Sequence, residues 1–99
     1  MARKIIWTEN AKEDLREIIS YLKHEWSNQV AENFVDDCYS RIHLIAQFPY
    51  IGVASGKIKS VRRIFITKHN SIYYFADENE IFLLDFFDNR QSPQKNIYE

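Results

Sequence analysis

Hydrophobic residues recur at helical spacing through the first half of the chain. Thr8 is a good N-cap, and Glu9 follows it in the first turn, where the helix dipole favours an acid. The first apolar stripe consists of Ala11, Leu15, Ile18 and Leu22. The second consists of Ala31, Phe34, Val35, Cys38, Ile42 and Ile45. The pattern resets at residues 25–28 and ends at Pro49, so the spacing predicts two amphipathic helices joined as an antiparallel hairpin.

Strand-like patterns lie on either side of this hairpin. Residues 4–7, KIIW, are apolar and partly β-branched, and they predict a first strand. After a glycine-bearing loop at 49–57, the strand-like runs are 59–67, 71–76 and 80–87. The turns between these runs are short, which predicts a three-stranded antiparallel meander. Residues 81–87 are apolar at six of seven positions, so we expect them to form a central strand with both faces at least partly covered.

These elements predict one α+β domain over residues 1–99, with the helical hairpin packed on one face of a small curved sheet. A single hairpin covers only one face, yet residues 71–76 carry aromatic side chains on both faces. The tail from residue 88 is polar, and Pro93 breaks any continued strand. We therefore expect either that the sheet curls enough to cover itself or that a partner covers the second face.

Composition narrows the class of protein further. The chain is 45% hydrophobic and 15% aromatic, so it can bury a core. The sequence contains neither an apolar run long enough to span a membrane nor a signal peptide. Cys38 is the only cysteine, and its neighbours suggest a small buried hydrophobe. We expect a cytoplasmic protein with no membrane partner.

The net charge of −1 hides a partition along the chain. Residues 8–37 hold eight acids against three bases, whereas residues 38–70 hold six bases and no acid. The bases of this second region are Arg41, Lys57, Lys59, Arg62, Arg63 and Lys68. Segregation of this kind creates a local positive field, although a solvated loop and strand edge would also account for it.

The sequence offers little other chemistry. The three histidines are far apart and no phosphate-binding loop is present, so we expect no metal and no cofactor. Cleavage of RNA through its own 2′-hydroxyl remains, with charge from Arg62, Arg63, Lys68 and Arg90. His69 could serve as acid or base in that reaction, or could simply be a turn residue between two strands.

Several short motifs occur in an order and spacing that resemble one family. The opening motif comprises Trp7, Ala11, Asp14, Leu15, Ile18, Tyr21 and Leu22. The later motifs are Phe48-Pro49 with Gly52, the basic strand at 61–63, IYYF at 72–75 and FFDNRQSP at 86–93. Together they resemble the RelE/ParE toxins of type II toxin–antitoxin systems over residues 5–93.

The resemblance implies a small bacterial cytoplasmic toxin of a plasmid-stabilisation type, bound and neutralised by a cognate antitoxin. It implies that Arg62, Arg63, Lys68, Tyr74 and Arg90 bind the target or the antitoxin, whose acidic tail would meet the cations. A homodimer, or a heterotetramer with the antitoxin, is the assembly that we expect.

The resemblance leaves three functions open. In the mRNA-cleaving branch, the site residues would be Arg62 or Arg63, His69, Arg90 and Tyr98, and cleavage would need no metal. That set is incomplete, because Ser71 stands where the nucleases begin a strand with arginine. The chain also lacks the positive surplus that ribosome binding favours. We therefore expect a ParE-like inhibitor of DNA gyrase, with the ribosome-dependent nuclease as the alternative, and an inactive antitoxin-binding member as a third reading.

Overall fold

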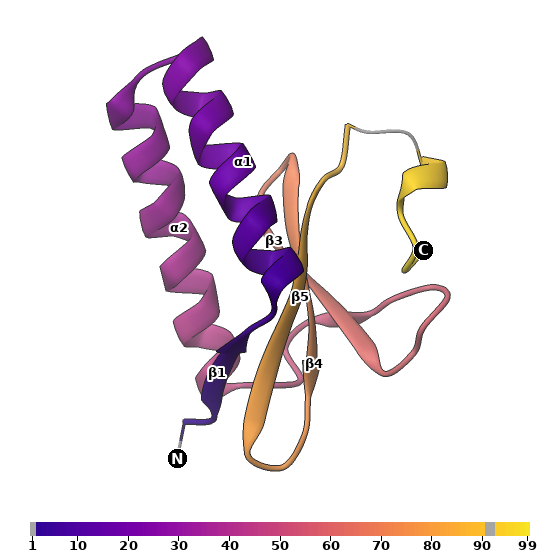
Figure 1. Ribbon diagram of the computed structural model, residues 1–99. Helices are drawn as coiled ribbons and strands as arrows, with labels where there is room; N and C mark the ends of the chain where they lie inside the picture. The colour runs from indigo at the N-terminus through magenta and orange to yellow at the C-terminus, as the bar shows by residue number, and fades with distance from the viewer. Residues whose placement is uncertain (1, 91–92) are drawn as a thin grey trace.

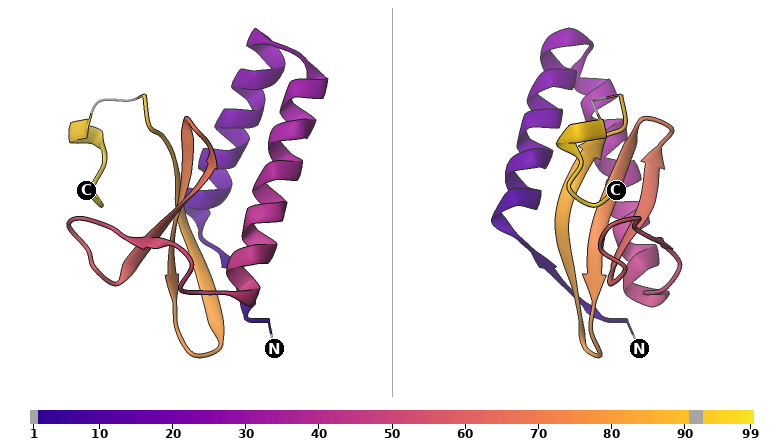
Figure 2. Two further views of the ribbon diagram at one scale, coloured as in Figure 1. Left: turned by 180° about the vertical axis from the view of Figure 1, so that it is seen from behind. Right: turned by 90° about the vertical axis from the view of Figure 1, so that its right-hand side faces the viewer.

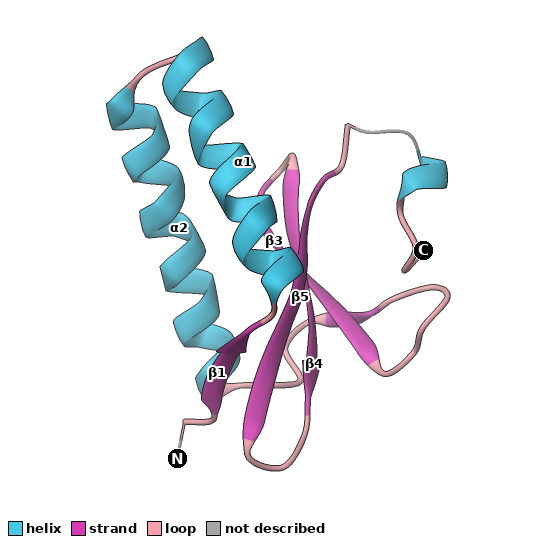
Figure 3. Ribbon diagram, viewed as in Figure 1, coloured by secondary structure: helices cyan, strands magenta, loops and turns pink. Residues whose placement is uncertain are grey.

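The computed structural model describes residues 2–90 and 93–99 and has an α+β fold (Figure 3). The first elements are β1 (Lys4–Trp7), α1 (Glu9–Glu25) and α2 (Asn28–Gln47). They are followed by β2 (Val53–Ala54), β3 (Val61–Thr67), β4 (Asn70–Ala76), β5 (Glu80–Asp88) and the short 3-10 helix η1 (Pro93–Lys95). Gln91 and Ser92, which belong to the last motif of the family resemblance, lie outside the described residues.

The helical hairpin is confirmed, and local capping explains its boundaries. The Thr8 hydroxyl accepts a hydrogen bond from the backbone N–H of Ala11 at 3.2 Å, which starts α1. Ser27 starts α2 in the same way, because its hydroxyl accepts from the N–H of Val30 at 3.1 Å. The sharp reset in the sequence pattern therefore corresponds to a second N-cap after a very short connection.

The sheet is mixed, with strand order β1-β5-β4-β3-β2. The meander of β3, β4 and β5 is antiparallel, as the short turns predicted. The first strand adds to the far edge and runs parallel to β5, so that β5 is a central strand, as its composition predicted. The prediction of a loop over residues 49–57 was partly wrong, because Val53 and Ala54 pair with β3 as a two-residue edge strand.

A bulge in β5 determines which of its side chains face the helices and which face the opposite side of the sheet. Tyr74 pairs with Leu83, but Tyr73 pairs with Asp85, so Leu84 is the extra residue of the ladder. Side chains alternate between the two faces of a strand, and an extra residue reverses that alternation beyond it. Asp85 consequently shares a pair with Tyr73 rather than with the residues of the helix-covered face.

The main core lies between the helices and the sheet. Its fully buried members come from both layers, and they include Cys38 as the sequence suggested. The core residues are Ala11, Leu15, Phe34, Cys38, Ile42, Ile45, Ile66, Ile72, Tyr74, Ile81, Leu83 and Phe86. Within the described residues, neither helix is long and apolar enough to cross a membrane.

The second face of the sheet is partly covered by the chain itself. Figure 1 shows the two helices on one side of the sheet and residues 93–99 on the other, and the reverse view in Figure 2 agrees. The covering segment forms a smaller core of Val61, Tyr73 and Tyr98. From the sequence, we expected either curling of the sheet or a partner to cover this face. Around Tyr73 that expectation was wrong, because the polar tail of the chain itself covers the sheet there.

Candidate functional site

Arg62 and Arg63 point to opposite faces of the sheet. They are consecutive residues of β3, and their strand partners are Tyr74 in the main core and Tyr73 in the smaller core. The basic pair of the sequence is therefore not one cluster. Each arginine has to be considered with the neighbours on its own face.

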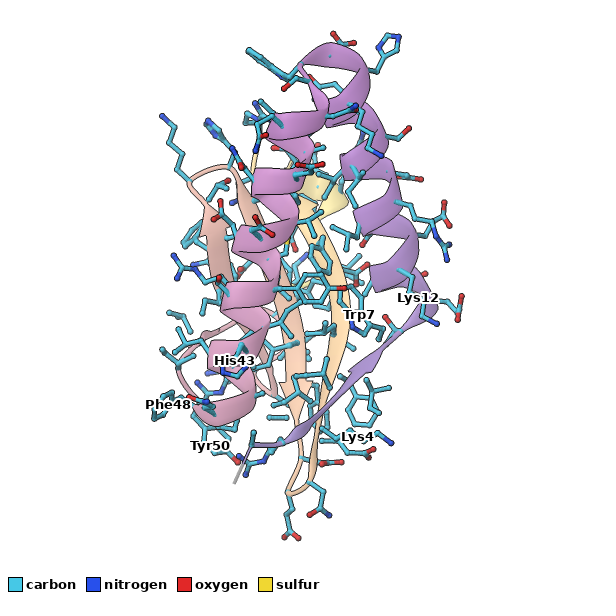
Figure 4. All side chains as sticks on the ribbon, turned by 90° about the vertical axis from the view of Figure 1, so that its left-hand side faces the viewer. Lys4, Trp7, Lys12, His43, Phe48 and Tyr50 are labelled. Atoms are coloured by element: carbon cyan, nitrogen blue, oxygen red, sulfur yellow. The ribbon has the colours of Figure 1, made fainter. Side chains whose placement is uncertain are left out.

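Arg62 holds the loop that follows α2. Its guanidinium donates to the carbonyl oxygen of Gly52 at 2.6 Å and lies 5.2 Å from the ring centre of Tyr50. The guanidinium of Arg3 lies 5.6 Å from the same ring. In Figure 4 the side chains of Tyr50 and Phe48 lie beside the C-terminal end of α2. Arg62 and Arg3 therefore fix an exposed aromatic residue at this end of the molecule.

Tyr74 anchors the same loop from inside the protein. Its hydroxyl donates to the carbonyl oxygen of Pro49 at 2.8 Å and accepts from the N–H of Gly52 at 2.9 Å. A Cβ at Gly52 would lie 2.6 Å from that hydroxyl, which explains the glycine of the Phe-Pro-x-x-Gly motif. Tyr74 is fully buried, so in this structure the side chain clamps a loop and presents no surface to a partner.

Arg63 binds a carboxylate on the second face. Its guanidinium lies 3.0 Å from Oε2 of Glu99, and the hydroxyl of Tyr73 donates to the same oxygen at 2.9 Å. The N–H of Gly56 donates to the other oxygen, Oε1, at 2.8 Å. Burial alone would raise the pKa of Glu99, but these donors outweigh it and lower the pKa below its ordinary value. We call Arg63, Tyr73 and Gly56 the carboxylate cradle.

Tyr98 lies next to this cradle and joins it to two acids. Its ring stacks on Tyr73 with 4.5 Å between ring centres, and its hydroxyl donates to Asp85. Asp14 of α1 lies close to Asp85 and accepts a hydrogen bond from the N–H of Phe86 at 3.0 Å. Burial and, to a smaller extent, the charge of Asp85 raise the pKa of Asp14 to about 6.

The two acids were missed as site residues in the sequence, although signals for them exist. Asp14 lies three residues after Ala11 and four before Ile18, so it falls on the apolar stripe of α1. Asp85 is the single acid inside the apolar run 81–87. A carboxylate within an otherwise apolar pattern indicates a specific partner, because burying an unpaired charge is costly.

Lys68, His69 and Arg90 come together at the other end of β3. They line a surface hollow of about 420 Å³ below the connection between the helices, together with Tyr21, Trp26 and neighbouring residues. Trp26 is 70% exposed and Tyr21 is 53% exposed. We call this group the hairpin hollow. The backbone carbonyl oxygen of His69 accepts from the N–H of Asn89 at 2.6 Å, which ties the β3–β4 turn to the end of β5.

Arg90 is paired within the hairpin hollow. Its guanidinium donates to both oxygens of Asp88, at 3.0 and 2.8 Å, and the bonds from Arg90 lower the pKa of Asp88. Ser71, which stands in place of a nuclease arginine, is buried and exchanges hydrogen bonds with Asn89. Across residues 2–90 and 93–99, no three His, Cys, Asp or Glu residues are grouped so that they could hold a metal.

The structure thus divides the predicted site residues among three places. Arg63 and Tyr98 lie together at the carboxylate cradle, whereas Lys68, His69 and Arg90 line the hairpin hollow. Arg62 lies apart from both, with Tyr50. From Arg63 to Thr67 the strand advances by four residues, which is about 13 Å at the usual rise per residue.

Comparisons with known proteins agree on one kind of protein. Residues 5–93 match the family model of the ParE toxin of the type II toxin–antitoxin system parDE. No curated protein matches the sequence. Among solved structures, a chromosomal ParDE system from P. aeruginosa is similar with a TM-score of 0.75 and 19% identity, over 88% of this chain and 96% of that chain.

Two further structures share the fold at lower similarity. The YoeB/ParE toxin from Agrobacterium tumefaciens has a TM-score of 0.61 and 14% identity, over 86% of this chain and 97% of that chain. The RelBE2 toxin–antitoxin complex from Mycobacterium tuberculosis has a TM-score of 0.56 and 11% identity, over 89% of this chain and 99% of that chain. At these identities the structures support the fold and say nothing of the target.

Proposed function

Because the chain belongs to the ParE family of toxins from type II toxin–antitoxin systems, we propose that it stops growth by binding DNA gyrase and that a cognate antitoxin neutralises it. Both partners would be met in the cytoplasm.

The observation that carries this choice is the separation of the candidate nuclease groups. Cleavage of RNA requires a base, an acid and a cation around one phosphate, all within hydrogen-bonding reach. Here His69 and Arg90 lie at the hairpin hollow, while Arg63 and Tyr98 lie on the second face of the sheet. Arg63 and Arg90 are moreover each paired with an acid of the chain itself.

The hairpin hollow has the composition of a protein-binding surface. Tryptophan, tyrosine and arginine are the residues that most often dominate the binding energy of protein interfaces. Trp26, Tyr21 and Arg90 occur together here, and both aromatic residues are more than half exposed. Lys68 adds a positive charge at the rim, which suits an acidic protein surface.

The test compares two activities of one preparation. The purified protein should inhibit supercoiling by gyrase, and cells that express it should filament with damaged DNA, whereas messages in a translating extract should stay intact. Trp26→Ala and Arg90→Ala should each weaken inhibition about tenfold or more, as expected for central interface residues. Arg16→Ala is the matched control, because Arg16 pairs with Glu13 on the exposed face of α1, away from the hairpin hollow. Intact supercoiling together with cut messages would overturn the proposal.

The nuclease reading keeps one structural argument in its favour. Asp14, with a pKa of about 6, lies close to Asp85, to which the Tyr98 hydroxyl donates, and Tyr98 stacks on Tyr73 beside Arg63. A proton-transferring group is thus linked through Tyr98 to a cation. If messages are cut, Asp14→Asn should reduce cutting, as should Arg90→Ala. If neither gyrase nor messages respond and expression leaves growth unchanged, the chain is an inactive family member that only binds its antitoxin.

A further inference from the structure

The outer side of the helical hairpin carries an uncovered apolar groove. Figure 4 looks onto this side, with both helices in front of the sheet, and Figure 2 shows no other described segment over it. Two surface hollows of about 320 and 270 Å³ meet at Ile19 and form one groove between α1 and α2. We call this groove the hairpin seam. Its apolar side chains include Trp7, Ile19, Val35 and Tyr39, and Tyr39 is 54% exposed.

The charges along the two sides of the seam have opposite signs. Residues 8–37 contain three bases, and all three line the seam from α1: Lys12, Arg16 and Lys23. The side formed by α2 contributes Glu32 and Asp36 instead. In a segment with eight acids, this placement of the bases gives the groove one basic side and one acidic side.

These charges are not neutralised within one molecule. Lys23 and Glu32 line the same hollow, yet no ion pair among the described residues involves Lys23, Glu32 or Asp36. Lys12 and Arg16 form exposed pairs within α1, and such pairs contribute little in water. The seam therefore fits a partner that has an apolar centre and the opposite arrangement of charges.

A second copy of the chain has that arrangement. When two seams face each other about a two-fold axis parallel to the helices, α1 of each copy lies over α2 of the other, and the basic side meets the acidic side twice. Lys23 and Glu32 lie at one level of the hairpin, so Lys23 of each copy then faces Glu32 of the other. A two-fold axis across the helices would instead place α1 on α1 and bring like charges together, which is costly at an interface.

We propose that the protein associates with a second copy of itself through the hairpin seam, about a two-fold axis parallel to the helices. Four-helix bundles with antiparallel neighbours use the same combination of an apolar centre and charged edges. The family resemblance led us to expect a homodimer without indicating a surface for it. None of the residues that line the seam lines the hairpin hollow, so this dimer leaves the proposed gyrase-binding surface of each copy free.

Charge reversal tests the pairing across the axis. Sedimentation equilibrium of the purified full-length protein, free of antitoxin, should show a monomer–dimer equilibrium. Lys23→Glu and Glu32→Lys should each weaken dimerisation about tenfold, because the two-fold axis repeats each repulsive contact. The double variant Lys23→Glu, Glu32→Lys restores opposite charges and should regain the affinity of the unchanged protein.

Controls separate this pairing from a general effect of charge. Lys59→Glu and Glu78→Lys make the same changes at exposed positions outside the helices, and they should leave dimerisation unchanged. Tyr39→Ser removes part of the apolar centre and should weaken dimerisation at high salt as well, where charge pairs are screened. Circular dichroism checks the fold of each variant, and Lys23→Gln or Glu32→Gln replaces a charge reversal that does not fold, with a smaller loss expected.

Cross-linking tests the direction of the axis. A carbodiimide joins an amine to a carboxylate that it contacts, without a spacer. In a mixture of isotope-labelled and unlabelled protein, Lys23 of one copy should be joined to Glu32 of the other, and mass spectrometry of the mixed peptides detects that product.

Several results would contradict the proposal. These are a free protein that stays monomeric at the millimolar concentrations used for NMR, a dimer that charge reversal does not weaken, and a double variant that does not regain affinity. The seam would belong to another occupant, and the proposal would be overturned, if the free toxin is monomeric and Lys23→Glu weakens binding of the antitoxin instead.

Discussion

The two faces of the sheet are built by different means. The face under the helices is sealed by twelve buried residues whose side chains are almost all apolar. Among the described residues, the smaller core on the opposite face has three buried hydrophobic members, and polar contacts of Tyr73, Arg63 and Gly56 hold its cover in place. Apolar burial resists exchange with water, whereas a set of polar donors can change one acidic occupant for another. Stability and recognition are therefore placed on opposite sides of the same strands.

The largest effect that would test this comparison comes from neighbouring leucines of β5. Leu83 is fully buried under the helices, whereas Leu84, the bulge residue, is partly buried on the other face. Leu83→Ala should lower the free energy of unfolding by about 3 kcal/mol, because the main core cannot collapse around the cavity. Leu84→Ala should lower the free energy of unfolding by clearly less. Urea denaturation of both variants checks the difference, and equal losses would contradict the comparison.

A smaller effect is expected at the loop that joins the faces. Gly52→Ala would place a Cβ 2.6 Å from the Tyr74 hydroxyl and 2.9 Å from the carbonyl oxygen of Arg63, so part of the loop must shift. The free energy of unfolding should fall by about 2 kcal/mol, as in other overpacked sites. Gly56→Ala is the milder counterpart, since its nearest neighbour is the Glu99 carboxylate at 3.2 Å. Thermal melts of the two variants should rank in that order, and the reverse order would count against this account of the loop.

A third test uses pH to examine Asp14, which lies between the helix layer and the tail. The pKa of Asp14 is raised from 3.8 to about 6, so the native state holds its proton more tightly than the unfolded chain does. The contribution of Asp14 to the free energy of unfolding is complete below pH 3.8, and it is lost as the pH rises through about 6. Solvent screening of this half-exposed group reduces the effect to about 1 kcal/mol.

Asp14→Asn should remove that loss and leave the remaining pH dependence unchanged. Asp88 and Glu99 have lowered pKa values and contribute in the opposite direction, so only the difference between the variant and the unchanged protein isolates Asp14. Urea denaturation at about pH 4.5 and pH 7 measures this difference. If the difference in free energy of unfolding between the two proteins is the same at both pH values, Asp14 does not contribute to the pH dependence of stability.

The smallest effect on stability is expected at the carboxylate cradle itself. Glu99→Gln should lower the free energy of unfolding by about 0.5 kcal/mol, because an accessible ion pair gains little against solvent. Arg16→Gln, at a pair whose side chains are 67% and 60% exposed, should cost no more than that. Chemical denaturation should thus separate the cradle from the main core, and a loss of several kcal/mol would place Glu99 among the structural residues.

Local elements of the fold could be predicted from the sequence because they depend on nearby residues. Thr8 and Ser27 cap the helices that their positions indicate, and short turns make the meander antiparallel. The parallel pairing of Ile5 with Ile81 joins the two ends of the chain, and no local pattern encodes it. Val53–Ala54 is too short to show any period.

The site was harder to predict, because its contacts join distant parts of the chain. The alternation of strand side chains predicts that Arg62 and Arg63 lie on opposite faces, so residues adjacent in the sequence need not form one basic cluster. The packing of Tyr98 on Tyr73 could not be predicted from the sequence. A single aromatic residue in a polar tail shows no hydrophobic periodicity that would indicate burial. The pairing of Asp14 with Asp85 depends on how α1 crosses β5.

The bulge at Leu84 changes which residues of β5 face the main core. Before it, β5 supplies Ile81 and Leu83 to the interior; after it, the frame is inverted and Asp85 turns toward Tyr98. Phe86 still reaches the main core beyond the bulge, so the same short segment serves both faces of the sheet. Without the bulge, strict alternation through the same residues would turn the Asp85 carboxylate toward the apolar interior, so the extra residue keeps this acid out of the main core.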